Sequence, residues 1–546
     1  MTFDRDLAAF QKWLARQVRE AEKHQGHVSD EYQQGWLDAM IDMQHLLVAY
    51  EMGLGKTVIT IAAVEKLIED GQVGGGLIIC PASIKLQWKR LIEDFAPDAN
   101  VIVVNGTAPQ REAQYQRYKR GEGEYCIINP EQMVNDWEIV SRLPRDFIVA
   151  DEATWFKNFK PQRSKKIKRL KATYQWALTG QPVENRAEEV YSIMSWINPT
   201  VLGNFKTFDA AFIKRDPWGR VRVYRNLPTL HRLLSEHMVR RTRSEVADQL
   251  PAVVAPAPIL VEADQGTRML YRRMVHDLEA ELAEAMNTWG NFSLSGFYRG
   301  EEQGEARGRI MSKITCMRML VDHPELLRLS AAHYRGVLPG NRMGSEYAQE
   351  LHAAGRLEGL KKAPKLDALV GTEDKPGLIR EILEAHPENK IVFFSFFKDM
   401  LDIVAERTRS LTKSVLFTGA VSITNRDKAK QTFATDPDTR LFLSSDAGGI
   451  GLDLPVANYL ISYDLPWSSG AFAQRQSRII RLSSKFPQVT LLTIQVAGSI
   501  EEYQHLLLQQ KKKVADAVVD GKGINPRGGL SMDLRSLSEW LRESVV

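Results

Sequence analysis

The sequence predicts an α/β protein made of two parallel-sheet lobes with helical insertions. Short apolar runs alternate with helical patterns in two separate series, residues 32–182 and 365–494. A long and mainly helical stretch divides the two series. The chain has 546 residues, and a single core rarely grows past about 250–300 residues. Two lobes therefore account for the length and for the pattern.

The first series predicts a doubly wound sheet. Its strand-like runs lie at residues 46–49, 76–80, 101–104, 125–128, 147–150 and 176–178. Most of them end in turn or polar residues and are followed by a helical pattern, which is typical of parallel strands joined through helices. Residues 1–30 are expected to form a polar N-terminal helix without a core of its own. The first lobe is expected at 31–255, with a basic, mainly helical protrusion at about 186–250.

The second series follows a Pro-rich passage that begins at residue 250. A long helical region at about 265–327 comes next, and residues 256–364 are expected to form a helical protrusion or linker. Strand-like runs then recur at 390–395, 414–417, 439–444, 459–463 and 489–494. They place the second lobe at 365–521, and residues 522–546 are expected to form a tail with a short amphipathic helix.

Composition narrows the class of protein. Hydrophobic residues make up 44% and charged residues 26%, as in ordinary soluble proteins. No apolar stretch predicts a membrane span or a signal peptide. The three cysteines are far apart, which argues against a zinc ribbon or a disulfide framework and fits a reducing cytoplasm. We expect a cytoplasmic protein of a prokaryote or a viral host. A net charge of +4 permits a polyanionic partner without requiring one.

The most specific motif is a glycine-rich turn that carries a lysine and a threonine. It reads Gly53, Leu54, Gly55, Lys56 and Thr57, and it stands between an apolar run and a helical segment. A strand, a glycine turn and a helix form the context of a phosphate-binding loop, the Walker A motif. Backbone N–H groups would converge on phosphate oxygens, Lys56 would reach the β- and γ-phosphates, and Thr57 would help to hold Mg²⁺. The simpler interpretation is a glycine turn before an ordinary helix.

Two carboxylates, Asp151 and Glu152, follow the apolar run 147–150. Ligands bind at the carboxyl ends of strands in open α/β sheets. Asp151 is expected to coordinate Mg²⁺, and Glu152 to polarise the water that attacks the γ-phosphate. An acidic pair alone also suits a solvated loop. Combined with Lys56 in the same sheet, it indicates nucleotide hydrolysis.

From about residue 32 to 521 the sequence resembles the Swi/Snf-type branch of the superfamily-two helicases, ATPases that move along duplex DNA. Several segments carry the resemblance. Residues 51–57 resemble the family's first motif, residues 80–88 resemble a loop that touches the DNA backbone, and residues 151–158 resemble the Asp-Glu-Ala-His motif. Residues 178–185 resemble the segment that couples hydrolysis to lobe movement, residues 238–251 resemble the end of the first lobe, and residues 319–326 resemble a helix end. The resemblance implies two RecA-like lobes with ATP bound between them.

The second lobe carries two further motifs of this family. Residues 444–454 resemble its glycine-rich motif, in which Gly449 and Gly451 would allow close approach to phosphate. Residues 474–481 resemble its arginine motif. Arg478 and Arg481 stand about one helical turn apart, which predicts that they share a helix face. The resemblance implies that they act as arginine fingers, whereas a solvated arginine pair is the plain alternative. Residues 499–513 resemble the helix that closes the second lobe.

Gln33 resembles the glutamine that reads adenine in this family, although a surface position on a helix suits it equally. Five residues depart from the family pattern at positions on the relay between hydrolysis and DNA grip: Thr154, Gln181, Asp453, Ser477 and Ile480. None of them removes a phosphate, metal or finger residue. The departures bear on coupling and leave the expected ATPase chemistry in place.

A basic segment at 157–171 has no acidic residue and suits contact with DNA phosphates, although a solvated basic helix has the same composition. Three arginines, Arg240, Arg241 and Arg243, present a similar choice between DNA contact and packing within the lobe.

The resemblance implies a DNA-dependent ATPase that uses ATP and Mg²⁺ and translocates along duplex DNA, remodelling or displacing what is bound there. Two alternatives remain open at this stage. One is a strand-separating or branch-migrating helicase acting on forked or joint DNA. The other is an ATP-gated DNA-binding regulator with a weak ATPase, against which the intact Lys56, Asp151, Glu152 and both arginines argue.

Overall fold

The computed structural model describes residues 37, 39–215, 221–289, 304–336, 344–419, 423–446, 452–481, 484–523, 537 and 539–542. Within these residues, seven parallel strands form the first sheet in the order β3-β4-β2-β5-β6-β1-β9. The strands are β1 (His45–Tyr50), β2 (Gly76–Ile79), β3 (Val101–Val103), β4 (Tyr125–Ile128), β5 (Phe147–Ala150), β6 (Tyr174–Leu178) and β9 (Met238–Arg241). The expected parallel sheet of the first lobe is confirmed.

Apolar clusters cover both faces of this sheet. Leu47 and Ala49 of β1 pack in one cluster, and Leu46 and Val48 pack in the other, because successive strand side chains point to opposite faces. Burial on both faces explains why the strands read as continuous apolar runs. The covering helices are α3 (Lys56–Glu69), α4 (Lys85–Phe95), α5 (Ala108–Lys119), α6 (Pro130–Asn135), α7 (Trp137–Val140), α8 (Gln162–Ile167), α9 (Glu188–Ile197), α10 (Phe205–Phe212) and α11 (Leu227–Ser235).

The interval 186–250 differs from the helical protrusion expected there. It also contains a two-stranded antiparallel hairpin, β7 (Ile213–Arg215) with β8 (Val221–Tyr224). It ends in β9, which pairs with β1 and so belongs to the first sheet. Helix α9 is buried in the first-lobe core through residues such as Ile193 and Trp196. Most of this interval therefore completes the lobe.

The second sheet is also parallel, in the order β10-β16-β15-β12-β14-β13. Its strands are β10 (Ala252–Val254), β12 (Ile391–Phe394), β13 (Lys413–Phe417), β14 (Thr439–Ser444), β15 (Tyr459–Ser462) and β16 (Gln488–Val496), and β11 (Ile259–Val261) also pairs with β16. Strands β10 and β11 come from the Pro-rich passage. The chain thus enters the second sheet at Ala252, inside the interval expected for the first lobe. The helices of this lobe are α17 (Pro364–Val370), α18 (Leu378–Ala385), α19 (Lys398–Thr408), α20 (Ile423–Thr435) and α21 (Ser469–Gln476).

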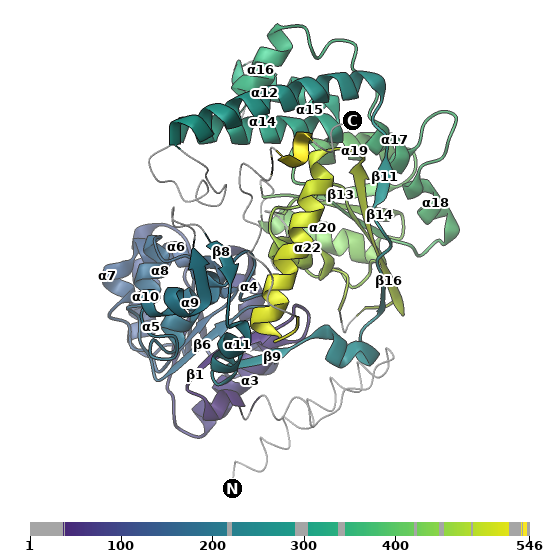
Figure 1. Ribbon diagram of the computed structural model, residues 1–546. Coiled ribbons are helices and arrows are strands. Elements are labelled where there is room, and N and C mark those ends of the chain that lie inside the picture. Colours follow the sequence, from purple (N-terminus) through teal and green to yellow (C-terminus); the bar gives the residue numbers. More distant parts are fainter. Residues whose placement is uncertain are drawn as a thin grey trace.

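A helical subdomain stands on the second lobe and has its own apolar cluster. Its helices are α12 (Gln265–Trp289), α14 (Gly304–Asp322), α15 (Pro324–Tyr334) and α16 (Glu346–Ala353), at the top of Figure 1. Two residues close to the C-terminus, Leu537 and Leu541, pack into the same cluster. Lys365 of α17 lies buried beneath the subdomain and forms ion pairs with Asp322 of α14, at 2.6 Å, and with Glu501.

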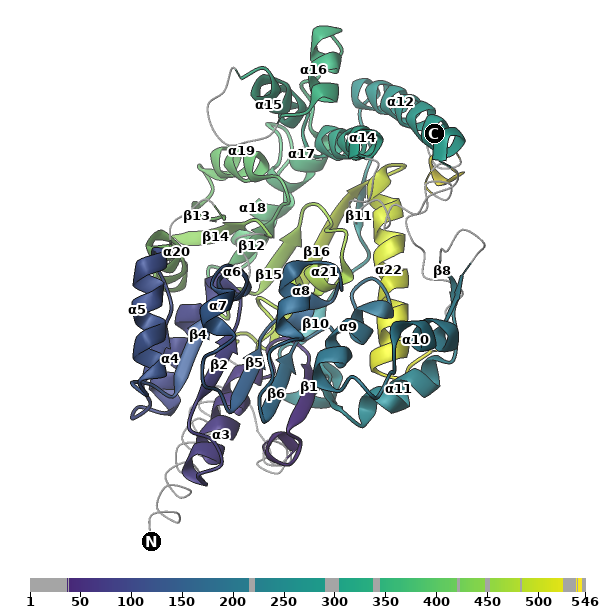
Figure 2. The same cartoon turned by 90° about the vertical axis from the view of Figure 1, so that its left-hand side faces the viewer.

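Helix α22 (Ile500–Val519) runs along both lobes, as the yellow helix of Figures 1 and 2 shows. Its first half packs with the helical subdomain through Ile500 and Tyr503. Its last residues, Val518 and Val519 among them, belong to the core of the first lobe. The helix that was expected to close the second lobe therefore also reaches the core of the first.

Candidate active site between the two lobes

The glycine-rich turn connects β1 to α3, as predicted. Gly53 has φ 89° and Gly55 has φ 77°, and both values are in the left-handed region that side chains disfavour. Gly55 caps α3, so Lys56 and Thr57 occupy the first turn of that helix. The backbone N–H groups and the positive end of the helix dipole point toward the loop. This arrangement suits the binding of phosphate.

Lys56 faces the two carboxylates that the sequence pairs with it. Its Nζ donates to the backbone oxygen of Tyr50 at 2.9 Å and to that of Glu51 at 3.4 Å. Burial lowers the pKa of Lys56, while the charges of Glu152 and Asp151 act in the opposite direction. The predicted lysine and acidic pair therefore lie in one site.

Asp151 and Glu152 follow β5 and differ in their surroundings. Asp151 accepts a hydrogen bond of 2.8 Å from the indole Nε1 of Trp88, which also makes that tryptophan a member of the site. The backbone of Glu152 has φ 48°, a strained value for a residue with a side chain. Burial raises the pKa of Asp151. Burial and the neighbouring Asp151 raise the pKa of Glu152.

Trp88 was expected on a loop that touches DNA. It is instead 1% exposed, on α4 beneath the site. The motif that contains it was recognised, but its role toward Asp151 was missed, since nothing in the spacing of Trp88 signals this contact.

The arginines of the second lobe reach the phosphate-binding loop. A Cβ atom added to Gly53 would lie 3.1 Å from Nη1 of Arg481. Arg478 lies close enough to Glu152 for its charge to lower the pKa of that carboxyl, although burial outweighs it. Burial, with the neighbouring Arg481, lowers the pKa of Arg478 to about 10. Arg478 and Arg481 of the second lobe therefore both lie close to residues of the first-lobe site.

The expectation that Arg478 and Arg481 share a helix face is wrong. Helix α21 ends at Gln476, and both arginines lie beyond it. The backbone oxygen of Arg478 accepts a hydrogen bond of 2.9 Å from the N–H of Leu454, a contact that competes with continuation of the helix. Arg481 forms an ion pair with Asp453, one of the residues that depart from the family pattern.

Buried polar atoms of this region that have no hydrogen-bond partner among the described residues include Oε2 of Glu152 and Nε of Arg481. An unpaired polar atom in a buried site costs free energy unless a ligand or water satisfies it. A carboxylate oxygen and a guanidinium N–H would be satisfied by an attacking water and by phosphate oxygens. The residues present therefore fit a nucleotide.

The lobes also touch where α21 begins. The carboxylate of Glu184 forms an ion pair with Lys157 and accepts a hydrogen bond of 2.9 Å from the Ser468 hydroxyl. The Ser469 hydroxyl donates to the backbone oxygen of Glu184 at 2.8 Å. A Cβ on Gly470 would lie 2.6 Å from Cδ of Glu184, so a side chain has no room there. Glu184 therefore connects the segment 178–185 to the helix that leads to the arginines.

Two sets of basic residues were candidates for DNA contact, the segment 157–171 and the three arginines Arg240, Arg241 and Arg243. Within the first lobe, Lys157 pairs with Glu184, the Lys166 amine donates to the backbone oxygen of Val134, and the Lys168 amine donates to Ser192. The exposed basic residues of the segment 157–171 are Lys160, Arg163, Lys165, Arg169 and Lys171. Arg240, Arg241 and Arg243 all bond within the protein, to Asp520, Glu245 and the backbone of Met52 respectively. Packing within the protein accounts for these three arginines.

Three predicted binding residues, Gln33, Gly449 and Gly451, lie outside the described residues. Among the described residues, no group of three His, Cys, Asp or Glu side chains could hold a metal ion. Mg²⁺ is commonly bound by one or two protein groups together with substrate phosphates, so Thr57 and Asp151 remain suitable partners. In the part of the chain described here, no helix is both long and apolar enough to cross a membrane.

Two facing α/β lobes, one with the phosphate-binding loop and the other with two arginines beside it, are the arrangement of a nucleotide-binding protein with residues of both lobes at its site. The model of the SNF2-related domain matches residues 11–326, and that of the helicase conserved C-terminal domain matches 374–483. The chain belongs to the SNF2-related family.

Similar proteins come from eukaryotes, bacteria and archaea. TATA-binding protein-associated factor mot1 of Schizosaccharomyces pombe is 26% identical over 87% of this chain and 25% of its own length. The putative ATP-dependent helicase/translocase YwqA of Bacillus subtilis is 27% identical over 87% of this chain and 46% of its own. A solved SWI2/SNF2 ATPase core of Sulfolobus solfataricus in complex with dsDNA has 22% identity and a TM-score of 0.39, covering 94% of this chain and 96% of that one. The chain spans a quarter to about half of these two curated relatives.

Proposed function

We propose that this protein is a DNA-dependent ATPase that couples ATP hydrolysis to movement along duplex DNA and so remodels or displaces what is bound there. The observation that carries the proposal is the approach of Arg481 to Gly53 across the two lobes. A site completed by both lobes makes hydrolysis depend on their arrangement. Family membership and a relative described as an ATP-dependent helicase/translocase support it.

The first lobe would hold the triphosphate. Backbone N–H groups from Gly53 to Thr57 would surround the phosphate oxygens, and Lys56 would leave the carbonyls of Tyr50 and Glu51 to reach the β- and γ-phosphates. Mg²⁺, held by the Thr57 hydroxyl and Asp151, would neutralise charge that develops on the phosphates. Gln33, if it follows the family, would read adenine.

The chemistry would use Glu152 and the two arginines. Glu152, held in a strained conformation with a raised pKa, would orient the water and accept its proton. Arg478 and Arg481 would stabilise the charge on the transferring phosphoryl group. Gly449 and Gly451 would add backbone contacts from the second lobe. Each cycle of closing and opening would then move one lobe relative to the other.

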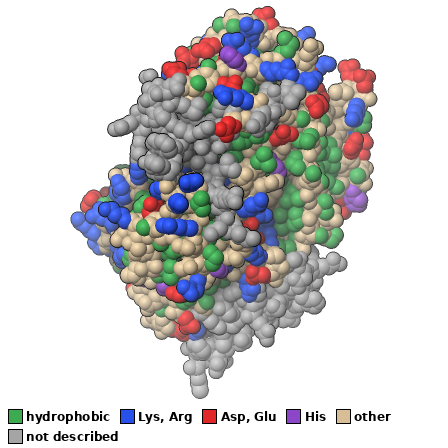
Figure 3. Space-filling model, viewed as in Figure 1, with side chains coloured by type: hydrophobic (Ala, Val, Ile, Leu, Met, Phe, Trp, Pro, Cys, Tyr) green, Lys and Arg blue, Asp and Glu red, His purple; other side chains and the backbone are tan. Residues whose placement is uncertain are grey.

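Duplex DNA is the partner that we propose. The exposed residues Arg163 and Lys165 lie on α8, and Arg169 follows it. Figure 3 shows Lys and Arg side chains gathered on the left, over the part of the first lobe where Figure 1 places α7 and α8. Such a surface suits sequence-independent contact with phosphates. The bacterial relatives support action in a prokaryotic cytoplasm.

The direct experiment measures the ATPase rate with blunt duplex DNA, single-stranded DNA, forked DNA and RNA side by side. The proposal expects the largest stimulation with duplex, and displacement of a triplex-forming strand without separation of the duplex. Stimulation by forks alone, with unwinding, would show a strand-separating or branch-migrating helicase instead. DNA affinity that changes with nucleotide while hydrolysis stays negligible would show an ATP-gated regulator.

A further inference from the structure

Helix α22 brings a carboxylate from the end of the second lobe to the base of the nucleotide site. Asp520 immediately follows the helix, and its Oδ1 accepts a hydrogen bond of 2.6 Å from Nε of Arg240. The side chains are 16% exposed for Arg240 and 11% for Asp520. A charge-assisted hydrogen bond shielded from water in this way is stronger than a surface ion pair.

The position of Asp520 is fixed on the first lobe. Gly521 has φ 64°, and a Cβ there would lie 2.8 Å from Cδ2 of His231, which belongs to α11. Val518 and Val519 are buried in the first-lobe core. The end of α22 is therefore docked tightly enough to place a carboxylate beside Arg240.

Arg240 also donates hydrogen bonds to the chain that enters the phosphate-binding loop. Its Nη1 donates to the backbone oxygens of Ala49, at 2.7 Å, and Gly180, at 3.2 Å, and its Nη2 donates to Oε1 of Glu51 at 3.3 Å. The three acceptors lie at the ends of β1 and β6, next to the loop. One guanidinium thus holds the loop entry and the segment that follows β6 together.

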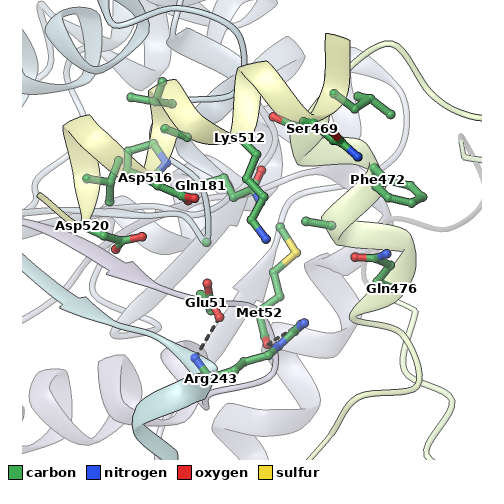
Figure 4. Close-up of a pocket in the computed structure, with 18 of the residues that line it drawn as sticks. Glu51, Met52, Gln181, Arg243, Ser469, Phe472, Gln476, Lys512, Asp516 and Asp520 are labelled. Atoms are coloured by element: carbon green, nitrogen blue, oxygen red, sulfur yellow. Dashed lines mark hydrogen bonds between the residues drawn. The ribbon is translucent and has the colours of Figure 1, made fainter. Parts of the chain in front are cut away.

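Glu51 contacts both Arg240 and the lysine of the phosphate-binding loop, Lys56. Its Oε2 accepts a hydrogen bond of 2.8 Å from the backbone N–H of Arg243, and its own backbone oxygen receives the Lys56 amine at 3.4 Å. Arg243 in turn donates to the backbone oxygen of Met52 at 3.1 Å. Figure 4 shows Glu51, Met52 and Arg243 on one side, and Asp516 and Asp520 of the α22 segment on the other.

A cavity of about 330 Å³ borders these residues, lined among others by Glu51, Arg240, Lys512, Asp516 and Asp520. Its walls carry charges of both signs and come from both lobes and α22. A substitution at Asp520 would therefore border this polar cavity and would not leave a void in an apolar core.

We propose that Asp520 is a positioning residue for the phosphate-binding loop, acting through Arg240 and Glu51. Helix α22 is anchored at its other end on the helical subdomain. Through Asp520, this helix therefore makes nucleotide affinity depend on the arrangement of the lobes. The inference rests on the proposed ATP-binding function and adds a route of regulation to it.

The test compares Asp520→Asn with the wild-type full chain, by titration with a fluorescent ATP analogue and by steady-state ATPase. Loss of one charge-assisted bond predicts a Kd for nucleotide about tenfold higher. The value of kcat at saturating ATP should stay within about twofold, since the bond acts on binding in the ground state and the transition state alike. Asp520→Glu, which keeps the charge, should recover most of the affinity.

Arg90→Ala is the matched control, because it removes another ion pair between the lobes, Arg90 with Asp427 at 3.2 Å, without touching the loop. It should leave nucleotide affinity unchanged. Combined Asp520→Asn and Glu51→Gln should weaken binding by less than the product of the single effects, since both act through Arg240. Should Asp520→Asn fail to fold, Arg240→Lys serves instead, because lysine cannot bridge the same acceptors.

Wild-type affinity in Asp520→Asn, or an equal loss in Arg90→Ala, would overturn the inference. A wild-type chain that binds no nucleotide would contradict the proposed function itself, so the two failures are distinguishable.

Discussion

The indole Nε1 of Trp88 donates a hydrogen bond of 2.8 Å to Oδ2 of Asp151, across 63 residues of sequence. The other carboxylate oxygen, Oδ1, accepts the backbone N–H of Glu152 at 2.8 Å. Both oxygens of the proposed metal-binding carboxylate are thus oriented by the first lobe. An outer residue that orients a metal ligand contributes to metal affinity without touching the metal.

Trp88→Phe should therefore raise the Mg²⁺ concentration that half-saturates ATPase activity, by about tenfold or more. Phenylalanine keeps the aromatic packing but has no N–H to donate. Trp155→Phe is the control, since the Trp155 indole donates to the backbone oxygen of Asp151 and not to its carboxylate. Equal Mg²⁺ dependence in wild type and Trp88→Phe would show that the indole does not orient the metal ligand.

Arg478→Ala should lower kcat at saturating ATP by about three orders of magnitude, the effect typical of a lost arginine finger. Nucleotide affinity should change much less, because this arginine acts on charge that develops in the transition state. Single-turnover hydrolysis and equilibrium binding separate the two effects. Arg407→Ala, an exposed arginine of α19 in the same lobe, provides the comparison. A variant that loses affinity but keeps kcat would assign Arg478 to binding alone.

Asp453→Asn should lower the KM for ATP several-fold. The carboxylate of Asp453 pairs with Arg481 and competes with phosphate for that guanidinium. Asparagine, the residue that the resembling family uses here, would release the arginine. Steady-state kinetics measure the change, with Asp427→Asn as an exposed acidic control on α20. An unchanged or higher KM would mean that Asp453 holds Arg481 in its working position.

Lys365→Met should destabilise the second lobe and the helical subdomain by about 3–5 kcal/mol, the typical effect of breaking a buried ion pair. Lys365 is fully buried between Asp322 and Glu501, and its loss would leave two buried carboxylates without their cation. Thermal unfolding measures the effect, and Lys398→Met, an exposed lysine on α19, is the comparison. Equal melting temperatures would show that the pair is not structurally important.

The sequence patterns predicted strands well wherever burial on both sides makes them continuously apolar. The runs 125–128, 147–150 and 439–444 coincide with β4, β5 and β14. Strands β10 and β11 were missed because they are short, rich in neighbouring proline and largely exposed; Val253 is 46% exposed. Their pairing with β16, more than 230 residues later, has no local signal.

The residues of the site were likewise predictable where the strand pattern positions them, and not where tertiary contacts do. Lys56, Asp151 and Glu152 could be placed together because each follows a strand of one parallel sheet. The end of α21 could not be predicted, because the hydrogen bond from Leu454 to the backbone oxygen of Arg478 is a tertiary contact. The role of Trp88 and the reach of α22 to Arg240 depend on the packing of distant segments, which residue spacing does not record.

We propose that ATP is hydrolysed between Lys56 and Glu152 of the first lobe and the arginines of the second. The most direct measurement is DNA-stimulated ATP hydrolysis by Lys56→Ala and Glu152→Gln beside the wild type. Loss of hydrolysis in both variants is predicted, with nucleotide binding weakened in Lys56→Ala and retained in Glu152→Gln. DNA-stimulated hydrolysis that persists at the wild-type rate in either variant would contradict the account.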